Sequence, residues 1–214
     1  MRMGILSKPL TWLSLALLAA VVLLALIAQR QLLSGRAAEP GATPAAGLAA
    51  DIVIPPKSMP APDFSLRDQD GKTISASALR GRVLAITFLD SHCKQLCPLE
   101  GDQLGQAQRS LGSHNNLSLL VVSVAPATDT PDSERAFAAT HHWTGEWHWL
   151  TGTPDQLAAV WKAYSIEVQG TSDNILHSTV VYLVDKAGFQ RAGWASGLQP
   201  DQLARDVRFL QAEA

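Results

Sequence analysis

The sequence predicts an α/β protein with a central mixed sheet flanked by helices, preceded by one transmembrane helix. Three observations support this. Apolar runs of strand length alternate with helical patterns after residue 61. The run from Leu10 to Ala28 contains 19 residues without a charge. The chain's 2 cysteines, Cys93 and Cys97, fall between a predicted strand and a predicted helix, at the sheet edge where open α/β folds place their sites.

The N-terminus is predicted to anchor the chain in a membrane. Residues 1–9 form a short cytoplasmic segment, and residues 10–28 would span about 28 Å as a helix, close to the thickness of a bilayer core. Basic residues flank the run, which suits lipid better than a buried core helix does. A cleaved signal usually has a shorter apolar region of about 7 to 15 residues. The short N-terminus has no acidic residue and should stay on the inner side, so everything after Ala28 is expected on the outer side.

Residues 29–60 are predicted to be a flexible tether. The segment is rich in Ala, Gly and Pro and has no periodic apolar face, so it cannot bury enough surface to fold. A flexible coil of this length spans on the order of 30 Å, which would let the following domain reach a partner in the membrane. A plain spacer is equally consistent with this composition.

Residues 61–214 are long enough for one domain with a full core. "DFSLRDQDGKTIS" predicts a hairpin around an Asp-Gly turn, and "VLAITFL" predicts a strand buried on both faces. Further strands are predicted at 117–125, 147–150, 178–185 and 190–195, and helices at 98–111, 130–142, 153–164 and 199–211.

The charge balance excludes one class of partner. From Asp51 onward the chain has 13 basic and 18 acidic side chains, a net charge of −5. Binding to phosphate backbones needs a basic face, so nucleic acid is not expected as a partner.

The two cysteines are suited to reactive chemistry. The N-terminus of a helix stabilises thiolate over thiol, and Lys94 adds a nearby cation. Thiolate is the form that binds metal or attacks a disulfide. Two such groups four positions apart in a turn can converge on one point, so a metal clamp and a redox couple both remain open.

A metal site needs a further ligand, and His177 is the strongest candidate among the 6 histidines. It stands in "TSDNILHSTVVYLVD", where a loop enters an apolar strand, so its imidazole is expected at the rim of the sheet. The other five are assigned structural positions in turns, helix ends or a strand: His92, His114, His141, His142 and His148.

Four motifs in order resemble one family. "FSLRDQDGKTISASALRGRVLAITFLDSHCKQLCP", "SVAPATDTPD", "LTGTPDQLAAVWKAY" and "HSTVVYLVDKAG" are similar to the Sco/SenC family of thioredoxin-like copper proteins, which act in cytochrome c oxidase assembly. The resemblance covers nearly all of residues 62 to 212. It implies a thioredoxin-like fold and one copper ion per chain, Cu(I) or Cu(II), on Cys93, Cys97 and His177. Two thiolates suit Cu(I), and an added imidazole suits Cu(II).

The chain departs from the family's usual pattern beside the cysteines. Lys94 and Gln95 stand where the family commonly has Pro and an acidic residue, and Ala125 replaces the Asp of a "VDP" motif. That Asp is thought to support the copper site, so weaker support is expected here, while the acidic "DTPD" segment from Asp129 survives. A divergent member is therefore expected.

The resemblance implies a chaperone in the bacterial inner membrane with its domain in the periplasm. It would deliver copper to the copper-site subunit of a cytochrome oxidase, or keep that site's cysteines reduced, and it would work with a periplasmic copper carrier or a thiol reductase. The alternative is a thiol-disulfide oxidoreductase of thioredoxin, peroxiredoxin or TlpA-like type, with Cys93 and Cys97 as the catalytic couple. The Cys-x-x-x-Cys spacing is wider than the usual redox motif and favours the ligand pair. A purely structural bridge would close too short a loop to stabilise the fold by much.

Overall fold

The structure, a computed structural model, describes residues 47–112, 115–171, 174–195 and 197–213. These belong to a compact unit that spans residues 46–214. The anchor predicted at residues 10–28 lies outside the described residues. Within the described ranges, no helix is long and apolar enough to cross a membrane.

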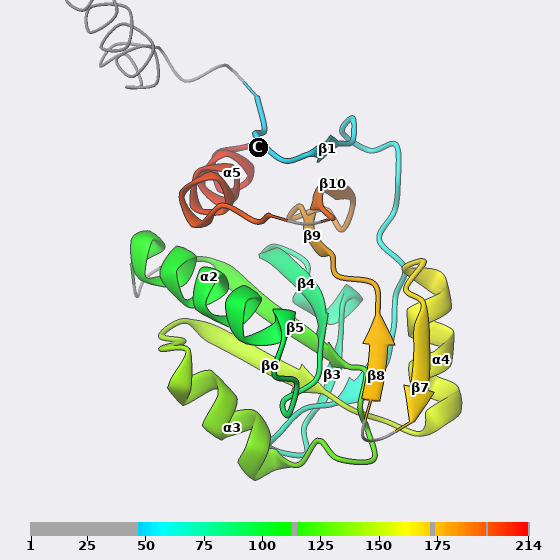
Figure 1. Ribbon diagram of the computed structural model, residues 1–214. Helices are drawn as coiled ribbons and strands as arrows, with labels where there is room; N and C mark the ends of the chain where they lie inside the picture. The colour runs from blue at the N-terminus through cyan, green and yellow to red at the C-terminus, as the bar shows by residue number, and fades with distance from the viewer. Residues whose placement is uncertain (1–46, 113–114, 172–173, 196, 214) are drawn as a thin grey trace, which may run out of the picture. The chain divides into compact units, whose positions relative to one another are not determined.

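A mixed six-stranded sheet forms the centre of this unit (Figure 1). Strands β4 (Val83–Leu89), β5 (Leu117–Ser123) and β6 (Glu146–Leu150) run parallel. On the other side of β4, β9 (Val181–Val184), β10 (Gln190–Trp194) and β1 (Ile52–Val53) continue the sheet in antiparallel pairs. The carboxyl ends of β4 and β5 meet at one edge, and the chain enters the cysteine loop there.

The pleat of β4 divides the core into two layers. All seven of its residues are buried, as its continuous apolar run predicts. Val83, Ala85 and Leu89 pack on one face of the sheet, and Leu84, Ile86 and Phe88 pack on the other. A register slip of one residue would exchange the two layers.

Helices cover both faces, which confirms the predicted α/β class. The first layer includes side chains of α2 (Leu96–Leu111), α3 (Pro131–Thr140) and α5 (Pro200–Ala212). The second contains α4 (Pro154–Ala163) and the hairpin of β2 (Ser65–Arg67) and β3 (Thr73–Ser75), with the short helix η1 (Ser77–Leu79) following the hairpin. Helices α3 and α4 both begin with a Thr capping box followed by Pro, the start signal that the sequence contains.

The predicted tether is wrong in its last residues. Strand β1 pairs with β10, and Pro60 forms a bridge with Phe189, so the chain already packs on the domain before residue 61. The backbone N–H groups of Ala49 and Ala50 donate to the carboxylate of Asp206 in α5 at 2.7–3.0 Å. Backbone hydrogen bonds, which an Ala- and Pro-rich composition does not reveal, fix this segment.

The structure also contains a hairpin that the sequence analysis does not predict. Strands β7 (Val168–Thr171) and β8 (Asn174–His177) pair antiparallel, separate from the main sheet. His177 is thus the last residue of a strand rather than the end of a loop. Figure 1 shows β8 leading directly into the central strand β9.

Candidate metal centre

Cys93 and Cys97 occupy different environments. Cys93 is half-buried in the loop between β4 and α2, whereas Cys97 lies in the first turn of α2 and is only 1% exposed. Cys97 packs within the core layer under α2, and Cys93 packs against the edge of that layer. Both are free thiols in this structure.

Short hydrogen bonds shape the loop that carries Cys93. The carboxylate of Asp90 accepts from the His92 N–H at 2.7 Å, and the Asp90 carbonyl accepts from the Cys93 N–H at 3.3 Å. The Gln95 N–H then points at the Cys93 sulfur, 3.5 Å away. The chain therefore turns sharply at the end of β4, and α2 begins at Leu96.

His177 approaches this helix from the β7–β8 hairpin. Its Nε2 lies 3.6 Å from the Cys97 sulfur, and its Nδ1 lies 3.0 Å from the Ser178 carbonyl oxygen. Because a carbonyl oxygen only accepts, Nδ1 carries the hydrogen and Nε2 faces the sulfur with its lone pair. A metal-binding imidazole is commonly oriented in this way.

The electrostatics differ from the sequence expectation at Cys97. Burial raises the pKa of its thiol, and the neighbouring Cys93 thiol and Glu100 carboxyl raise that pKa further. The helix N-terminus does not outweigh this burial. Cys97 is therefore a poor free nucleophile, but a metal ion that supplies positive charge directly would deprotonate it.

Glu100 is a buried carboxyl that the sequence analysis does not single out. Burial raises its pKa to about 7, although Thr87 forms a hydrogen bond with it. The Thr87 hydroxyl also lies 3.0 Å from the Val180 carbonyl oxygen. A hydroxyl has one hydrogen, so when Thr87 donates it to Val180, Glu100 must donate to Thr87 and be protonated. The helical spacing of Cys97, Glu100 and Leu104 could have indicated that Glu100 faces the core.

Ala125, where the family commonly has Asp, is 1% exposed and lies just beyond the end of β5. Its carbonyl accepts from the N–H groups of Thr128 and Asp129, so it closes the turn that follows the strand. A carboxylate is present four residues later, at Asp129. Asp129 reaches back to the cysteine loop, where it accepts from the N–H of Ser91 at 2.9 Å.

The donor set fits copper in either oxidation state. Cys97 and His177 already contact each other, and Cys93 lies in the adjoining loop, so two soft sulfur donors and one imidazole are available. Sulfur donors select Cu(I), and imidazole nitrogen also suits Cu(II). By contrast, His141 and His148 lie next to the carboxylates of Asp102 and Asp68, at 2.7 and 3.0 Å, as structural histidines do.

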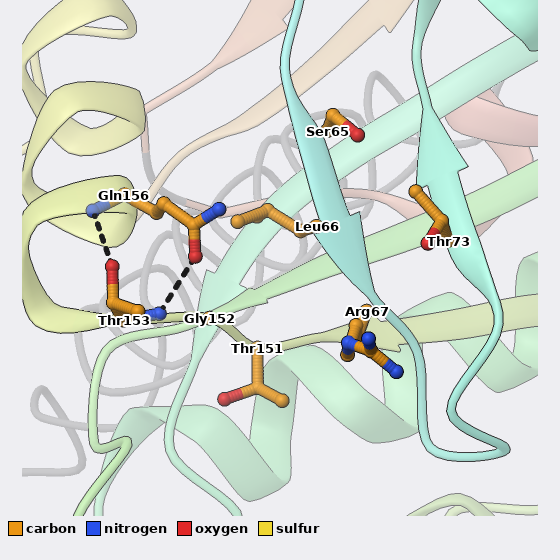
Figure 2. A pocket seen from close by; sticks show the side chains of 8 residues that line it. All are labelled: Ser65, Leu66, Arg67, Thr73, Thr151, Gly152, Thr153 and Gln156. Atoms are coloured by element: carbon orange, nitrogen blue, oxygen red, sulfur yellow. Dashed lines mark hydrogen bonds between the residues drawn. The ribbon is translucent and has the colours of Figure 1, made fainter.

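Two cavities differ in their relation to the cysteines. One of about 270 Å³ adjoins the start of α2, where Leu96, Leu99 and Glu100 line it together with Trp194. The other, of about 540 Å³, lies between the β2–β3 hairpin and the start of α4 (Figure 2). Its lining contains no cysteine or histidine, and Thr153 and Gln156 bond to each other there. The cavity beside the β2–β3 hairpin is therefore not a candidate copper site.

Comparisons with known proteins find relatives in one family. A family model described as SCO1/SenC matches residues 55–211. The mitochondrial protein SCO2 of Saccharomyces cerevisiae is 32% identical over 134 residues, which are 58% of this chain and 44% of that protein. The SCO1 protein homolog of Bacillus subtilis is 28% identical over 132 residues, 58% of this chain and 68% of that protein.

Solved structures share the fold. A crystal structure of yeast Sco1 with copper bound superposes with a TM-score of 0.63 at 25% identity, covering 73% of this chain and 91% of that one. The chain thus matches less than half of the yeast SCO2 protein but most of the yeast Sco1 crystal structure. The thioredoxin-like α/β fold predicted from the motifs is confirmed.

Proposed function

Because the chain belongs to the SCO1/SenC family, we propose that it is a membrane-anchored copper chaperone for a respiratory cytochrome oxidase. It binds one copper ion on Cys93, Cys97 and His177 and delivers it to the copper-site subunit of the oxidase. Residues 10–28 anchor it in the bacterial inner membrane, with the domain in the periplasm. A periplasmic copper carrier or a thiol reductase supplies the ion or the reducing power.

One observation carries this proposal: the 3.6 Å contact between the Cys97 sulfur and the His177 Nε2. These residues are 80 positions apart and come from different elements, α2 and β8. The contact unites the cysteine helix with the one histidine that the sequence singles out. The imidazole is also oriented with its lone pair toward the sulfur, as a ligand requires.

Copper uptake by this site is coupled to protons and to the thiol redox state. Binding converts the Cys97 thiol to thiolate, and the released proton passes to solvent. A disulfide between Cys93 and Cys97 would remove both sulfur ligands, so the pair must be reduced before loading. Copper binding should consequently weaken as the pH falls.

The proposal is tested with the reduced full-length chain in detergent. We expect one copper per chain and an intense sulfur-to-Cu(II) charge-transfer band. Cys93→Ser and Cys97→Ser should abolish the band and weaken competition for Cu(I), while His177→Ala should weaken Cu(II) more than Cu(I). His142→Asn is the matched control, because this exposed histidine has a φ of 55°, which Asn tolerates.

Two results would contradict the chaperone. One is a reduced chain without the band whose Cu(I) affinity equals that of Cys93→Ser. The other is reduction of model disulfides at a catalytic rate with no copper binding, which would establish the thiol-disulfide oxidoreductase instead. The buried, protonated Cys97 argues against that second outcome.

A further inference from the structure

A second group of metal-ligating side chains lies beside the cysteine loop. Ligand atoms of Asp90, His92 and Asp129 all lie within 4.8 Å of one another. Both oxygens of Asp129, however, already accept two hydrogen bonds each. Oδ1 accepts from the Ser91 N–H at 2.9 Å and the Ser91 hydroxyl at 2.6 Å. Oδ2 accepts from the Ser123 hydroxyl at 2.6 Å and the Trp149 indole N–H at 3.2 Å.

These four hydrogen bonds connect the cysteine loop to the sheet through Asp129, so its carboxylate is not free to bind a metal ion. A carboxylate has about four lone-pair directions, and all of them are used here. The donors on Oδ2 belong to the neighbouring sheet strands β5 and β6, where Trp149 is fully buried. The donors on Oδ1 both belong to Ser91, two residues before Cys93. Asp129 thus links the rigid sheet to the start of the cysteine loop.

The hydroxyl of Ser91 extends the linkage to His92. Since Ser91 gives its single hydrogen to Asp129, its oxygen can only accept from the His92 Nδ1, which is 3.0 Å away. The Ser133 hydroxyl of α3 lies 2.8 Å from the same oxygen. The Ser91 hydroxyl therefore has three hydrogen-bond partners, Asp129, His92 and Ser133, which hold the first half of the loop in place.

The two cysteines depend on this linkage to different degrees. Cys97 is held by α2 and by the core around it. Cys93 has less support, because it lies outside the helix, packs only against the edge of that core layer, and its N–H donates to the Asp90 carbonyl within the same loop. Loss of the Asp129 bonds should release Cys93 and leave Cys97 in place.

We propose that Asp129 is a positioning residue for the metal centre: it holds the loop so that the Cys93 sulfur faces Cys97 and His177. The proposal rests on the proposed copper function for its consequence in metal binding. In the family pattern, an Asp at position 125 supports the copper site. The proposal gives this supporting role to Asp129, which acts through its hydrogen bonds to Ser91. Because supporting bonds of this kind typically contribute 10- to 100-fold in metal affinity, a loss in that range is expected when they are removed.

The test compares Asp129→Asn and Ser91→Ala with wild type in the full-length reduced chain. Asp185→Asn is the matched control, since Asp185 also organises a turn through the N–H groups of Ala187 and Phe189, and it follows β9. The first readout needs no metal: alkylation rates of Cys93 and Cys97, resolved by peptide mass spectrometry. The second is the position of the Cu(II) charge-transfer band and the Cu(II) affinity.

We expect both site variants to raise the Cys93 alkylation rate relative to that of Cys97, and to shift the band with a loss of roughly 10-fold or more in affinity. Asp185→Asn should change neither. Should Asp129→Asn fail to fold, Ser91→Ala alone decides, because it removes one hydroxyl from a partly exposed loop. Unchanged Cys93 rates and an unchanged band in Ser91→Ala would overturn the proposal.

The outcome also separates this proposal from the copper function. A wild-type chain that binds no copper, with Cys93 still released by the variants, supports the positioning role and refutes the chaperone. A wild-type chain that binds copper, with variants indistinguishable from it, supports the chaperone and refutes the positioning role.

Discussion

Glu100 is a buried carboxyl next to the proposed metal ligands, and its burial makes the stability of the fold depend on pH. Its side chain is 4% exposed, one helical turn after Cys97, and burial raises its pKa to about 7. A protonated carboxyl leaves the pocket around Cys97 without an additional negative charge. Ionisation of Glu100 would add a charge that opposes the Cys97 thiolate, an effect that a bound metal cation would offset.

The raised pKa of Glu100 predicts a fall in stability with increasing pH. The folded pKa of about 7 lies above the unfolded value of 4.5. Its contribution is therefore fully present below about pH 4.5 and is lost as the pH rises to about 7, a total of about 3 kcal/mol. Urea unfolding at several pH values should show this loss in wild type. Glu100→Gln should make the decline shallower, because the amide can still donate to Thr87 without titrating.

Glu134 contributes in the same pH window, since burial raises its pKa to about 7 as well. Glu134→Gln should therefore remove a separate share of the slope. A slope in Glu100→Gln identical to that of wild type would mean that Glu100 is already ionised in the folded protein at low pH.

At the scale of elements, the sequence predicts those strands and helices whose positions are set by the local pattern of apolar residues. The strands β4 and β5 are continuous apolar runs, and α3 and α4 begin at Thr-Pro caps, so their positions follow from local physics. The positions of the proposed ligands follow from the family motifs. Both cysteines lie at the strand–helix junction as predicted, and the contact of Cys97 with His177 bridges 80 residues that no local pattern connects.

The missed elements depend on partners that are distant in sequence. Strand β1 has only two residues, both exposed, and it exists because β10 offers a free edge. The β7–β8 hairpin contains Gly170 and polar residues, which reduce strand propensity. The link from Asp129 to Ser91 joins residues 38 positions apart. Its only local signal is an acidic residue just before a helix, which normally indicates a cap.

The segment with β1 should be required for full stability. In a chain that starts at residue 61, the carboxylate of Asp206 loses the two N–H groups, of Ala49 and Ala50, that form three hydrogen bonds with it, and the Gln190 N–H loses the Met59 carbonyl. Each unsatisfied buried group costs about 1–3 kcal/mol, and a charged one costs more. We expect the free energy of unfolding to fall by about 3 kcal/mol or more relative to residues 47–214, measured in urea.

A double-mutant cycle identifies the cause of that loss. Asp206→Ala should destabilise residues 47–214, but it should have little effect or even stabilise residues 61–214, where the carboxylate has lost the Ala49 and Ala50 N–H donors. Equal stability of the two chain lengths would show that residues 47–60 are only a passive continuation of the tether.

At the scale of the whole molecule, the fold places the proposed metal centre at an exposed edge. The cysteine loop and His177 lie at one edge of the unit, and Leu96, Leu99 and Leu176 are each more than half exposed. Because the described chain already packs on the domain from about residue 47, the proposed tether would be shorter than the predicted 29–60 and would cover about 29–46. A flexible segment of that length spans on the order of 25 Å. An anchored domain would therefore search for its copper acceptor close to the bilayer surface.

The anchor itself gives the last prediction. The run from Leu10 to Ala28 has 19 uncharged residues, which is enough to span the hydrocarbon core and far more than a peripheral contact needs. We expect full-length protein to stay in the membrane fraction after an alkaline carbonate wash, and protease added from the periplasmic side to cut the domain from its anchor. A chain that lacks residues 1–28 should be recovered in the soluble fraction with its copper band intact, because the three proposed ligands belong to the packed unit. Recovery of wild type as a soluble form that begins near residue 38 would instead identify the run as a cleaved signal. The domain would then have to find its oxidase partner by free diffusion.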